Sequence, residues 1–309
     1  MNYKLAIIIP AYKHQFLSQS LESIVKQTCK KFNLYIGDDA SPYDLKSIIE
    51  PFKKRMPIVY KKFEKNLGLV SLTRQWSRCI DLSENEEFIW LFSDDDIMPD
   101  DAVERFYDEL GNNESHDLYR FNLQFINEKT IVIRNPSAHP RIESSQDFLK
   151  RRLSFSTISA ACEYIFSRKV YKNNNGYIEF PLAWCSDDAT WAVFGRQTGI
   201  LTIAGKPINM RMSSGLNISS DTKSNNLKFI AVISFVKWIH QNFRKDIAFK
   251  YYYFYLRSQI NTLSVRLVQR LSLLGSFLVF FNPIILIALI VNRSILYKSV
   301  DSLFSFDIK

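Results

Sequence analysis

Leu5-Ala6-Ile7-Ile8-Ile9-Pro10 is the stretch of this sequence that decides its fold. Five apolar residues in a row, ended by a proline, are typical of a strand that is buried on both faces of a sheet. Similar short runs recur, and an amphipathic helical pattern precedes each of them. The expected strands are 32–37, 58–62 and 88–92, and the expected helices are 16–29, 45–52 and 69–82. This alternation predicts an α/β fold with an open, mostly parallel sheet flanked by helices.

The amino-acid composition excludes several classes of protein. At 309 residues the chain can form one large or two ordinary domains, and 47% hydrophobic and 23% charged residues exclude a disordered chain. Four cysteines without a C-x-x-C pair argue against a disulfide framework or a zinc ribbon. Only nine glycines are present and no glycine-rich phosphate loop occurs, so the usual signatures of Rossmann and P-loop nucleotide binding are missing.

The net charge of +9 is unevenly distributed. Residues 206–309 hold 14 basic and 4 acidic residues, whereas residues 1–205 hold 26 and 27. Near residue 210 the composition also changes to a mixture of aromatic, aliphatic and basic residues. We therefore expect a ligand-binding and catalytic domain over 1–210 and a basic, aromatic, helical region over 211–309.

Within that basic region, residues 271–292 form a run of 22 residues without a charge. This length is sufficient for a membrane-inserting segment, and Asn282-Pro283 leaves open whether it spans the membrane or is re-entrant. A buried pair of core helices is the alternative. Because basic and aromatic residues flank the run, we expect contact with a membrane surface. The long aliphatic runs between the aromatic residues argue against nucleic acid as the partner.

Three adjacent carboxylates follow the expected strand 88–92, in Ser93-Asp94-Asp95-Asp96. Like charges so close together repel one another unless a cation neutralises them. Carboxylate oxygens suit hard divalent ions, so the triplet indicates a site for Mg²⁺ or Mn²⁺. A solvated acidic turn before the next helix is the alternative.

Two further acidic pairs extend this pattern. Asp38-Asp39 ends the expected strand 32–37, and the carboxyl ends of parallel strands share one ligand-binding edge of the sheet. Asp187-Asp188 follows an aromatic segment and opens an expected helix over 187–199. A carboxylate beside a like charge has a raised pKa and can act as a general base. A simple helix cap is the alternative for this last pair.

At this point several motifs, in order along the chain, resemble those of family-2 inverting glycosyltransferases of the GT-A fold, of bacterial polysaccharide or O-antigen type. The motifs are Ala6-Ile7-Ile8-Ile9-Pro10-Ala11-Tyr12, Leu21-Glu22-Ser23-Ile24 with Gln27-Thr28, the 32–41 strand and turn, Asn66-Leu67-Gly68 with Arg74, 88–96 with Pro99-Asp100, and Ser186-Asp187-Asp188. The resemblance covers about residues 4–200. It implies a GT-A-like sheet and transfer of a sugar from a nucleotide-sugar, specifically a UDP-sugar, to an acceptor hydroxyl.

The resemblance implies roles for residues on the donor side. Asp39 takes the place of the residue that hydrogen-bonds the nucleotide base, and Tyr12 the place of a side chain that packs on it. The backbone from Pro10 to Tyr12 lines the base pocket, and Arg74 stands where a basic residue approaches the base or diphosphate. Asp94 and Asp96 resemble the metal-binding D-x-D pair. Asp95 remains a candidate as well, because three consecutive aspartates do not show which two correspond to that pair.

The resemblance also implies the catalytic groups. Asp188 takes the place of the base that deprotonates the acceptor, and Asp187 that of the supporting acid. Trp184 is a possible sugar-stacking platform, with core packing as the alternative. Arg211 is a possible phosphate ligand.

Three positions depart from the family pattern, and one of them is Asp187, which replaces the usual glutamate and is one methylene shorter. Ala40 replaces a glycine, which predicts a turn without positive φ, and Lys13 replaces a common asparagine.

The resemblance leaves two other interpretations open. One alternative is a catalytically inactive, membrane-associated sugar-nucleotide-binding protein, which the intact acidic groups argue against. The other is a nucleotidyltransferase on a similar sheet, which would favour a glycine-rich loop that the segment 10–13 lacks. A lipid-linked saccharide is the expected acceptor, and the expected location is the cytoplasmic face of the bacterial inner membrane, peripheral or monotopic.

Overall fold

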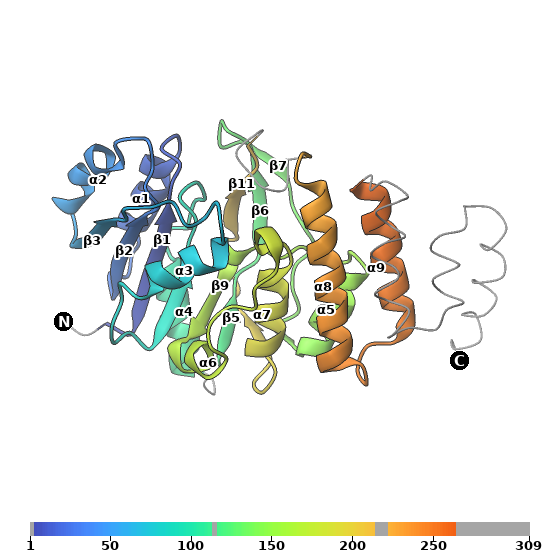
Figure 1. Ribbon diagram of the computed structural model, residues 1–309. Coiled ribbons are helices and arrows are strands. Elements are labelled where there is room, and N and C mark those ends of the chain that lie inside the picture. The colour runs from blue at the N-terminus through green and yellow to red at the C-terminus, as the bar shows by residue number, and fades with distance from the viewer. Residues whose placement is uncertain (1–2, 113–115, 214–221, 264–309) are drawn as a thin grey trace.

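The computed structural model describes residues 3–112, 116–213 and 222–263 (Figure 1). Its strands are β1 Leu5–Ala11, β2 Phe32–Asp38, β3 Ile58–Lys62, β4 Phe88–Leu91, β5 Leu118–Arg120, β6 Leu123–Ile126, β7 Val132–Arg134, β8 Ile142–Glu143, β9 Tyr164–Ser167, β10 Ile200–Thr202 and β11 Ile208–Arg211. Its α-helices are α1 Leu17–Val25, α2 Leu45–Lys53, α3 Leu72–Ile80, α4 Ala102–Asn112, α5 Ser145–Leu153, α6 Arg168–Asn173, α7 Ser186–Phe194, α8 Asn225–Phe243 and α9 Phe249–Thr262, and 3₁₀ turns lie at Ala161–Glu163 and Pro181–Ala183.

The described strands form a sheet of eight and a second sheet of three. The order in the large sheet is β3-β2-β1-β4-β9-β5-β10-β8. The first four strands in this order, β3, β2, β1 and β4, are parallel to one another and form the parallel half of the sheet. Strand β9 is antiparallel to both β4 and β5. The small sheet has the order β11-β6-β7. The prediction of an α/β fold with a mostly parallel sheet is therefore confirmed.

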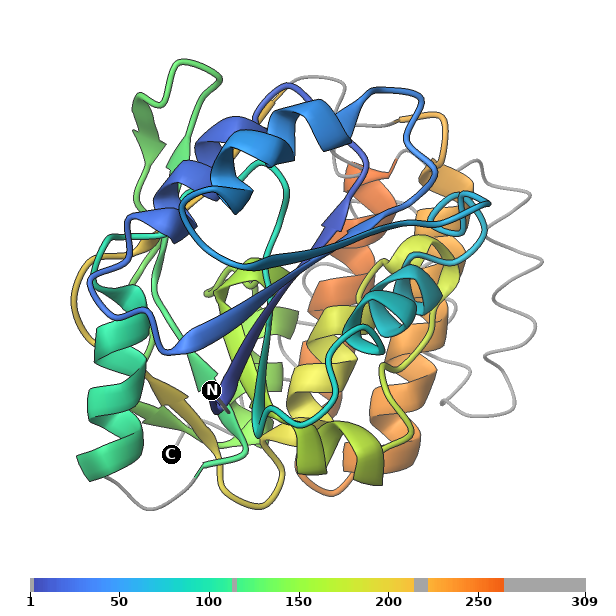
Figure 2. The ribbon, with the colours of Figure 1, turned by 90° about the vertical axis from the view of Figure 1, so that its left-hand side faces the viewer.

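Strand β1 lies in the middle of the parallel half, and its alternating side chains enter two separate cores. Leu5, Ile7 and Ile9 belong to a core formed with α1, α2 and α4. Ala6 and Ile8 belong to a core formed with α3, α5, α7, α8 and α9. Figure 2 shows these two groups of helices on opposite sides of the sheet. A continuous apolar run is what a strand covered on both faces requires.

Three expected elements have different bounds in the structure. From its apolar residues the segment 118–125 is also expected to form one strand. It is divided into β5 and β6, which belong to different sheets, because the chain passes from one sheet to the other at Phe121-Asn122. The expected helix over 69–82 begins only at Leu72, after Ser71, whose hydroxyl caps it by accepting from Arg74 N at 3.3 Å. The expected helix over 187–199 ends at Phe194, so Gly199 does not end it.

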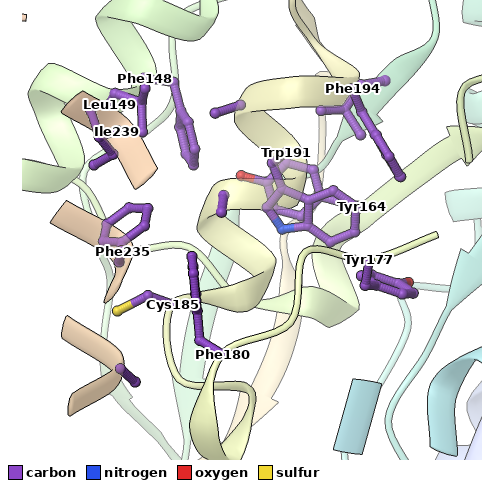
Figure 3. Close-up of a cluster of buried hydrophobic side chains, with 14 of the residues drawn as sticks. Phe148, Leu149, Tyr164, Tyr177, Phe180, Cys185, Trp191, Phe194, Phe235 and Ile239 are labelled. Atoms are coloured by element: carbon purple, nitrogen blue, oxygen red, sulfur yellow. The ribbon is translucent and has the colours of Figure 1, made fainter. Parts of the chain in front are cut away.

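The two C-terminal helices pack on the main body of the protein. Phe235 and Ile239 of α8 lie in the same buried cluster as Phe180 and Trp191 (Figure 3). In the part of the chain that the structure describes, no helix is long and apolar enough to cross a membrane. The segment 271–292 lies outside the described residues, and the division into 1–210 and 211–309 stays a prediction.

Candidate active site

One cavity of about 770 Å³ lies at the carboxyl ends of β1, β2 and β4. This is the edge at which open α/β sheets bind ligands. Of the residues that the sequence singles out, those that line it are Pro10, Tyr12, Lys13, Asp39, Asp94, Asp95, Asp96, Trp184, Asp187, Asp188 and Arg211. The sheet topology thus brings three acidic groups, far apart in the sequence, to one place.

Asp94 joins the end of β4 to the end of β1. Its Oδ2 accepts hydrogen bonds from the backbone N–H groups of Tyr12 and Lys13, at 2.9 and 2.8 Å. The Lys13 ammonium lies 3.4 Å from Asp94 Oδ1 and also forms an ion pair with Asp95. Burial lowers the pKa of Lys13, but the charges of Asp94 and Asp95 outweigh burial and raise that pKa above its ordinary value. Lys13 therefore neutralises part of the acidic triplet.

Asp96 faces the small sheet. Its Oδ1 accepts from Arg211 N at 2.8 Å. Burial first, and then the charge of Asp95, raise the pKa of Asp96 to about 6. The side chain thus sits in a strongly desolvated position, where an additional cation would stabilise its charged form.

Arg211 has a structural position. Its Nε donates to the Asp95 carbonyl at 2.9 Å, Nη1 donates to the Asn127 carbonyl at 2.8 Å, and Nη2 donates to Gln19 Oε1 at 2.7 Å. The guanidinium also lies 4.2 Å from the Phe16 ring centroid. All three nitrogens have partners inside the protein, so the prediction of a phosphate ligand is wrong; Arg211 instead anchors β11 to the acidic turn.

The chemistry of the triplet fits a hard divalent ion, since it offers carboxylate oxygens at the cavity wall. In the described part of the chain, however, no group of three His, Cys, Asp or Glu side chains is arranged to hold a metal. The Lys13 ammonium is already in contact with two of the carboxylates. An incoming Mg²⁺ or Mn²⁺ would compete with Lys13 and would need further ligands from water or substrate.

Asp39 is 4% exposed and organises the turn that follows β3. Its two oxygens accept from Leu67 N at 2.7 Å and Gly68 N at 2.9 Å. A Cβ atom on Gly68 would lie 2.6 Å from Asp39 Oδ2, so the close approach requires glycine. Arg78 also forms an ion pair with Asp39. The Asn66-Leu67-Gly68 motif is therefore explained by Asp39.

Arg74 does not reach the cavity. Its side chain is 68% exposed and lies 3.5 Å from Glu179. Arg78, one helical turn further along α3, is the arginine that contacts Asp39, and its guanidinium lies 3.9 Å from the Phe63 ring centroid. Arg74 and Arg78 lie four residues apart on the same face of α3, so the sequence pattern cannot tell which of them reaches Asp39.

The turn after β2 has a left-handed residue, which corrects the prediction for Ala40. Its φ is 52°, a conformation that costs about 1–2 kcal/mol for a residue with a Cβ. Asp38 Oδ1 accepts from Ser41 N at 2.7 Å, and Ser41 Oγ donates to the Tyr12 carbonyl at 2.7 Å. These hydrogen bonds hold the turn against that cost.

A strained segment precedes α7. Leu182, Ala183 and Cys185 have φ values of 60°, 53° and 64°, and Trp184 between them lines the cavity. Such clusters of left-handed residues are typical of functional sites, where surrounding structure enforces the conformation. The segment aims both Trp184 and the N-terminus of α7 at the cavity.

At that N-terminus, Asp188 forms a bidentate pair with Arg152. Arg152 Nε and Nη2 donate to its two oxygens at 2.7 and 2.8 Å. Burial first, and then the charge of Asp188, raise the pKa of Asp187 to about 7. The two adjacent carboxylates therefore differ in their contacts.

The cavity residues that the sequence analysis missed include Arg152, Phe155, Tyr255 and Gln259. Phe155 stacks on Tyr255, with ring centroids 5.4 Å apart and an interplanar angle of 21°. Tyr255 and Gln259 belong to α9, so the C-terminal region contributes to the cavity wall. The segment 144–153, which contains Arg152, has the sequence pattern of a basic helix, but that pattern does not indicate a cavity residue.

Comparison with solved structures agrees with this architecture. Residues 1–349 of TarS from S. aureus, in complex with UDP-GlcNAc, match with a TM-score of 0.57 and 14% identity over 86% of this chain and 83% of that one. GalNAc-T7 with UDP, GalNAc and Mn²⁺ matches with a TM-score of 0.57 and 11% identity, over 83% of this chain and 50% of that one. The mannosyltransferase PcManGT from Pyrobaculum calidifontis, with GDP-Man and Mn²⁺, matches with a TM-score of 0.51 and 13% identity. The match covers 99% of this chain and 89% of that one.

At these identities the likeness shows the fold alone. No curated protein is similar enough in sequence to count as a relative. The sequence model of glycosyl transferase family 2, in contrast, matches residues 6–173, which is more than half of the chain and contains the strands that carry Asp39 and the acidic triplet. Together with the observed sheet, this match shows that the chain belongs to glycosyl transferase family 2 and has a GT-A fold.

Proposed function

We propose that this protein is an inverting glycosyltransferase that moves a sugar from a nucleotide-sugar, specifically a UDP-sugar, to an acceptor hydroxyl. The observation that carries the proposal is the meeting of three acidic groups, Asp39, Asp94–Asp96 and Asp187-Asp188, around one cavity. Each group supplies what one part of the reaction needs: nucleotide recognition, charge compensation and a proton acceptor.

On the donor side, Tyr12 and Asp39 line one end of the cavity. Tyr12 is 38% exposed, so its ring is available to stack on a nucleotide base. Asp39 keeps acceptor capacity beyond its two backbone hydrogen bonds, and a carboxylate accepts from the N–H of a uracil. UDP in TarS and GalNAc-T7 supports a UDP-sugar, although PcManGT holds GDP-Man.

On the diphosphate side, Asp94 and Asp96 would hold a divalent ion, Mn²⁺ or Mg²⁺, with Asp95 beside them. Bound there, the ion would neutralise charge on the departing diphosphate. Mn²⁺ in the structures of GalNAc-T7 and PcManGT supports this part of the proposal. Until an ion binds, Lys13 supplies the positive charge at this position, and the ion would replace it there.

On the acceptor side, the Asp187-Asp188 pair supplies the proton acceptor, and Trp184 offers an apolar face to a sugar ring. Lys228 Nζ lies 4.9 Å from the Trp184 ring centroid, a cation–π contact that holds the ring in place. A single displacement at the anomeric carbon inverts its configuration. Attack by the acceptor and departure of the nucleoside diphosphate take place on opposite faces of the sugar.

We further propose a lipid-linked saccharide as the acceptor, at the cytoplasmic face of a bacterial inner membrane, in surface polysaccharide or O-antigen assembly. Apolar side chains at the cavity support an acceptor with a lipid part: Leu69 is 82% exposed and lines the cavity, and the adjacent Val70 is 80% exposed. The charge-free run 271–292 is the second support.

A donor screen tests the proposal. The protein is incubated with UDP-GlcNAc, UDP-GalNAc, UDP-glucose, UDP-galactose and GDP-mannose, each with Mn²⁺, and released nucleoside diphosphate is measured. We expect slow release from one UDP-sugar, abolished by Asp96→Asn. Tight binding of a UDP-sugar without release, even with saccharide acceptors added, would instead indicate an inactive binding protein.

A further inference from the structure

The two carboxylates at the start of α7 have different surroundings. Asp188 is 3% exposed, and both of its oxygens are occupied by the Arg152 guanidinium. Asp187 lines the same cavity and is more exposed than Asp188. In the described part of the chain, no side chain forms a hydrogen bond with Asp187. One carboxylate is therefore held by the protein, and the other is available to a ligand.

The contact with Arg152 makes Asp188 a poor proton acceptor. A bidentate, charge-assisted pair is strong, and protonation of the carboxylate would leave a buried guanidinium without its counter-ion. Arg152 is itself held in place, because its Nη1 donates to the Thr157 carbonyl at 2.9 Å. The pair is thus fixed in orientation from two sides.

Asp187 has the opposite electrostatic balance. Burial and the charge of Asp188 raise its pKa to about 7, while Arg152 and the N–H groups at the start of α7 oppose the rise. The other ionisable groups that face this pair are Tyr177, Cys185 and Tyr255, whose pKa values burial raises, so that all three are neutral near pH 7. From α8, Lys228 lies against the Trp184 ring, with its Nζ 4.9 Å from the ring centroid. A general base is most effective when its pKa lies near the working pH.

We propose that Asp187, not Asp188, takes the proton from the acceptor hydroxyl, and that Asp188 and Arg152 are a positioning pair. This assignment rests on the proposed function and changes the roles that the family resemblance implies. As the acceptor oxygen bonds to the anomeric carbon, its proton moves to a carboxylate oxygen of Asp187. The electron pair of the broken carbon–oxygen bond leaves with the nucleoside diphosphate. Asp188 stays paired with Arg152 throughout.

Two matched variants, Asp187→Asn and Asp188→Asn, test the assignment in the full-length protein. The probe is nucleoside diphosphate release from the UDP-sugar that the wild type uses best, measured from pH 5 to 9. Asp187→Asn is expected to lose at least about 100-fold in kcat/KM, the usual contribution of a general base. Asp188→Asn is expected to lose less and to move the acidic limb of the profile below pH 7, because the neighbouring negative charge is gone. Equal losses, or an unmoved limb in Asp188→Asn, would overturn the proposal.

Asp188→Asn leaves Arg152 unpaired and could unfold the protein, so a double variant with Arg152→Gln removes both charges together. This double variant is expected to keep more turnover than Asp187→Asn, and turnover equal to or below it would count against the assignment.

A second readout does not need activity. In protein labelled with ¹³C at aspartate carboxyls, a resonance titrating near pH 7 should be missing from Asp187→Asn and shifted to lower pH in Asp188→Asn. The reverse pattern would make Asp188 the basic group. If the wild type releases nucleotide from no nucleotide-sugar, the proposed function fails, while this titration still decides which carboxylate has the raised pKa.

Discussion

Two of the acidic groups that line the cavity, the triplet and the pair at α7, are neutralised in different ways. At the triplet, the flexible ammonium of Lys13 contacts Asp94 and Asp95 from the end of β1. At α7, the planar guanidinium of Arg152 binds both oxygens of Asp188. An ammonium is a point charge that another cation can replace, whereas a guanidinium fork fixes the orientation of its carboxylate. The comparison indicates that the triplet can exchange one cation for another, whereas Arg152 fixes the orientation of Asp188.

The same substitution at each cation should show this difference most strongly. Arg152→Met leaves Asp188 buried without a counter-ion, which typically costs about 3–5 kcal/mol of folding free energy. Lys13→Met should cost much less, about 1 kcal/mol, because water and added Mn²⁺ can reach the triplet. Urea unfolding with and without Mn²⁺ measures both. Equal costs, or no recovery of Lys13→Met by Mn²⁺, would remove the distinction between the two groups.

The pH dependence of stability should reflect the pair at α7. Because the folded-state pKa of Asp187 is raised to about 7, the folded protein binds this proton more tightly than the unfolded chain, whose aspartate pKa is about 3.9. Relative to Asp187→Asn, the wild type should therefore lose stability as pH rises from about 4 to about 7, by up to about 1.4 kcal/mol per pH unit. Urea unfolding of both proteins across this range measures the difference. A difference that is flat with pH would contradict the raised pKa.

Metal dependence should sharpen the account of the triplet. EDTA is expected to reduce nucleotide release, and Lys13→Met is expected to lower the Mn²⁺ concentration for half-maximal binding by about tenfold, since the competing charge is gone. Calorimetric titration of Mn²⁺ into both proteins measures this. Weaker Mn²⁺ binding by Lys13→Met would mean that Lys13 supports the metal site instead of competing for it.

The smallest effect is expected at α3. Arg78→Ala removes the cation beside Asp39 and should weaken UDP binding about three- to tenfold, because Asp39 then loses part of its orientation. Arg74→Ala, on an exposed side chain, is the matched control and should change UDP affinity less than twofold. Calorimetric titration with UDP measures the affinity of both variants. A larger loss of UDP affinity in Arg74→Ala than in Arg78→Ala would restore the role that the sequence resemblance implies for Arg74.

The sequence predicted the sheet and its acidic edge because both depend on local patterns. Apolar runs identify buried strands, and the residues after each run, such as Asp39 and Asp94, fall at the strand end whatever the details of packing. Individual partners could not be predicted in this way. Arg152 meets Asp188 across 36 residues and Tyr255 meets Phe155 across 100, and neither contact leaves a periodic signal.

Errors of one helical turn or one backbone conformation had physical causes. Leu69 and Val70 extend the apolar pattern of α3, but they are exposed, and the helix starts where the Ser71 hydroxyl can cap it. Ala40 adopts positive φ because hydrogen bonds to Asp38 and from Ser41 enforce the turn. At the start of α3 and at Ala40, hydrogen bonds made in the folded protein decide the backbone conformation, not the intrinsic preference of the residue.

The most direct test of the central claim is the position of Mn²⁺ and UDP in crystals of the protein, located by the anomalous scattering of manganese. The account predicts a manganese peak against Asp94 and Asp96, displacing the Lys13 ammonium, with the uracil between Tyr12 and Asp39. Manganese or UDP bound away from this cavity would contradict the claim that the three acidic groups form one donor and acceptor site.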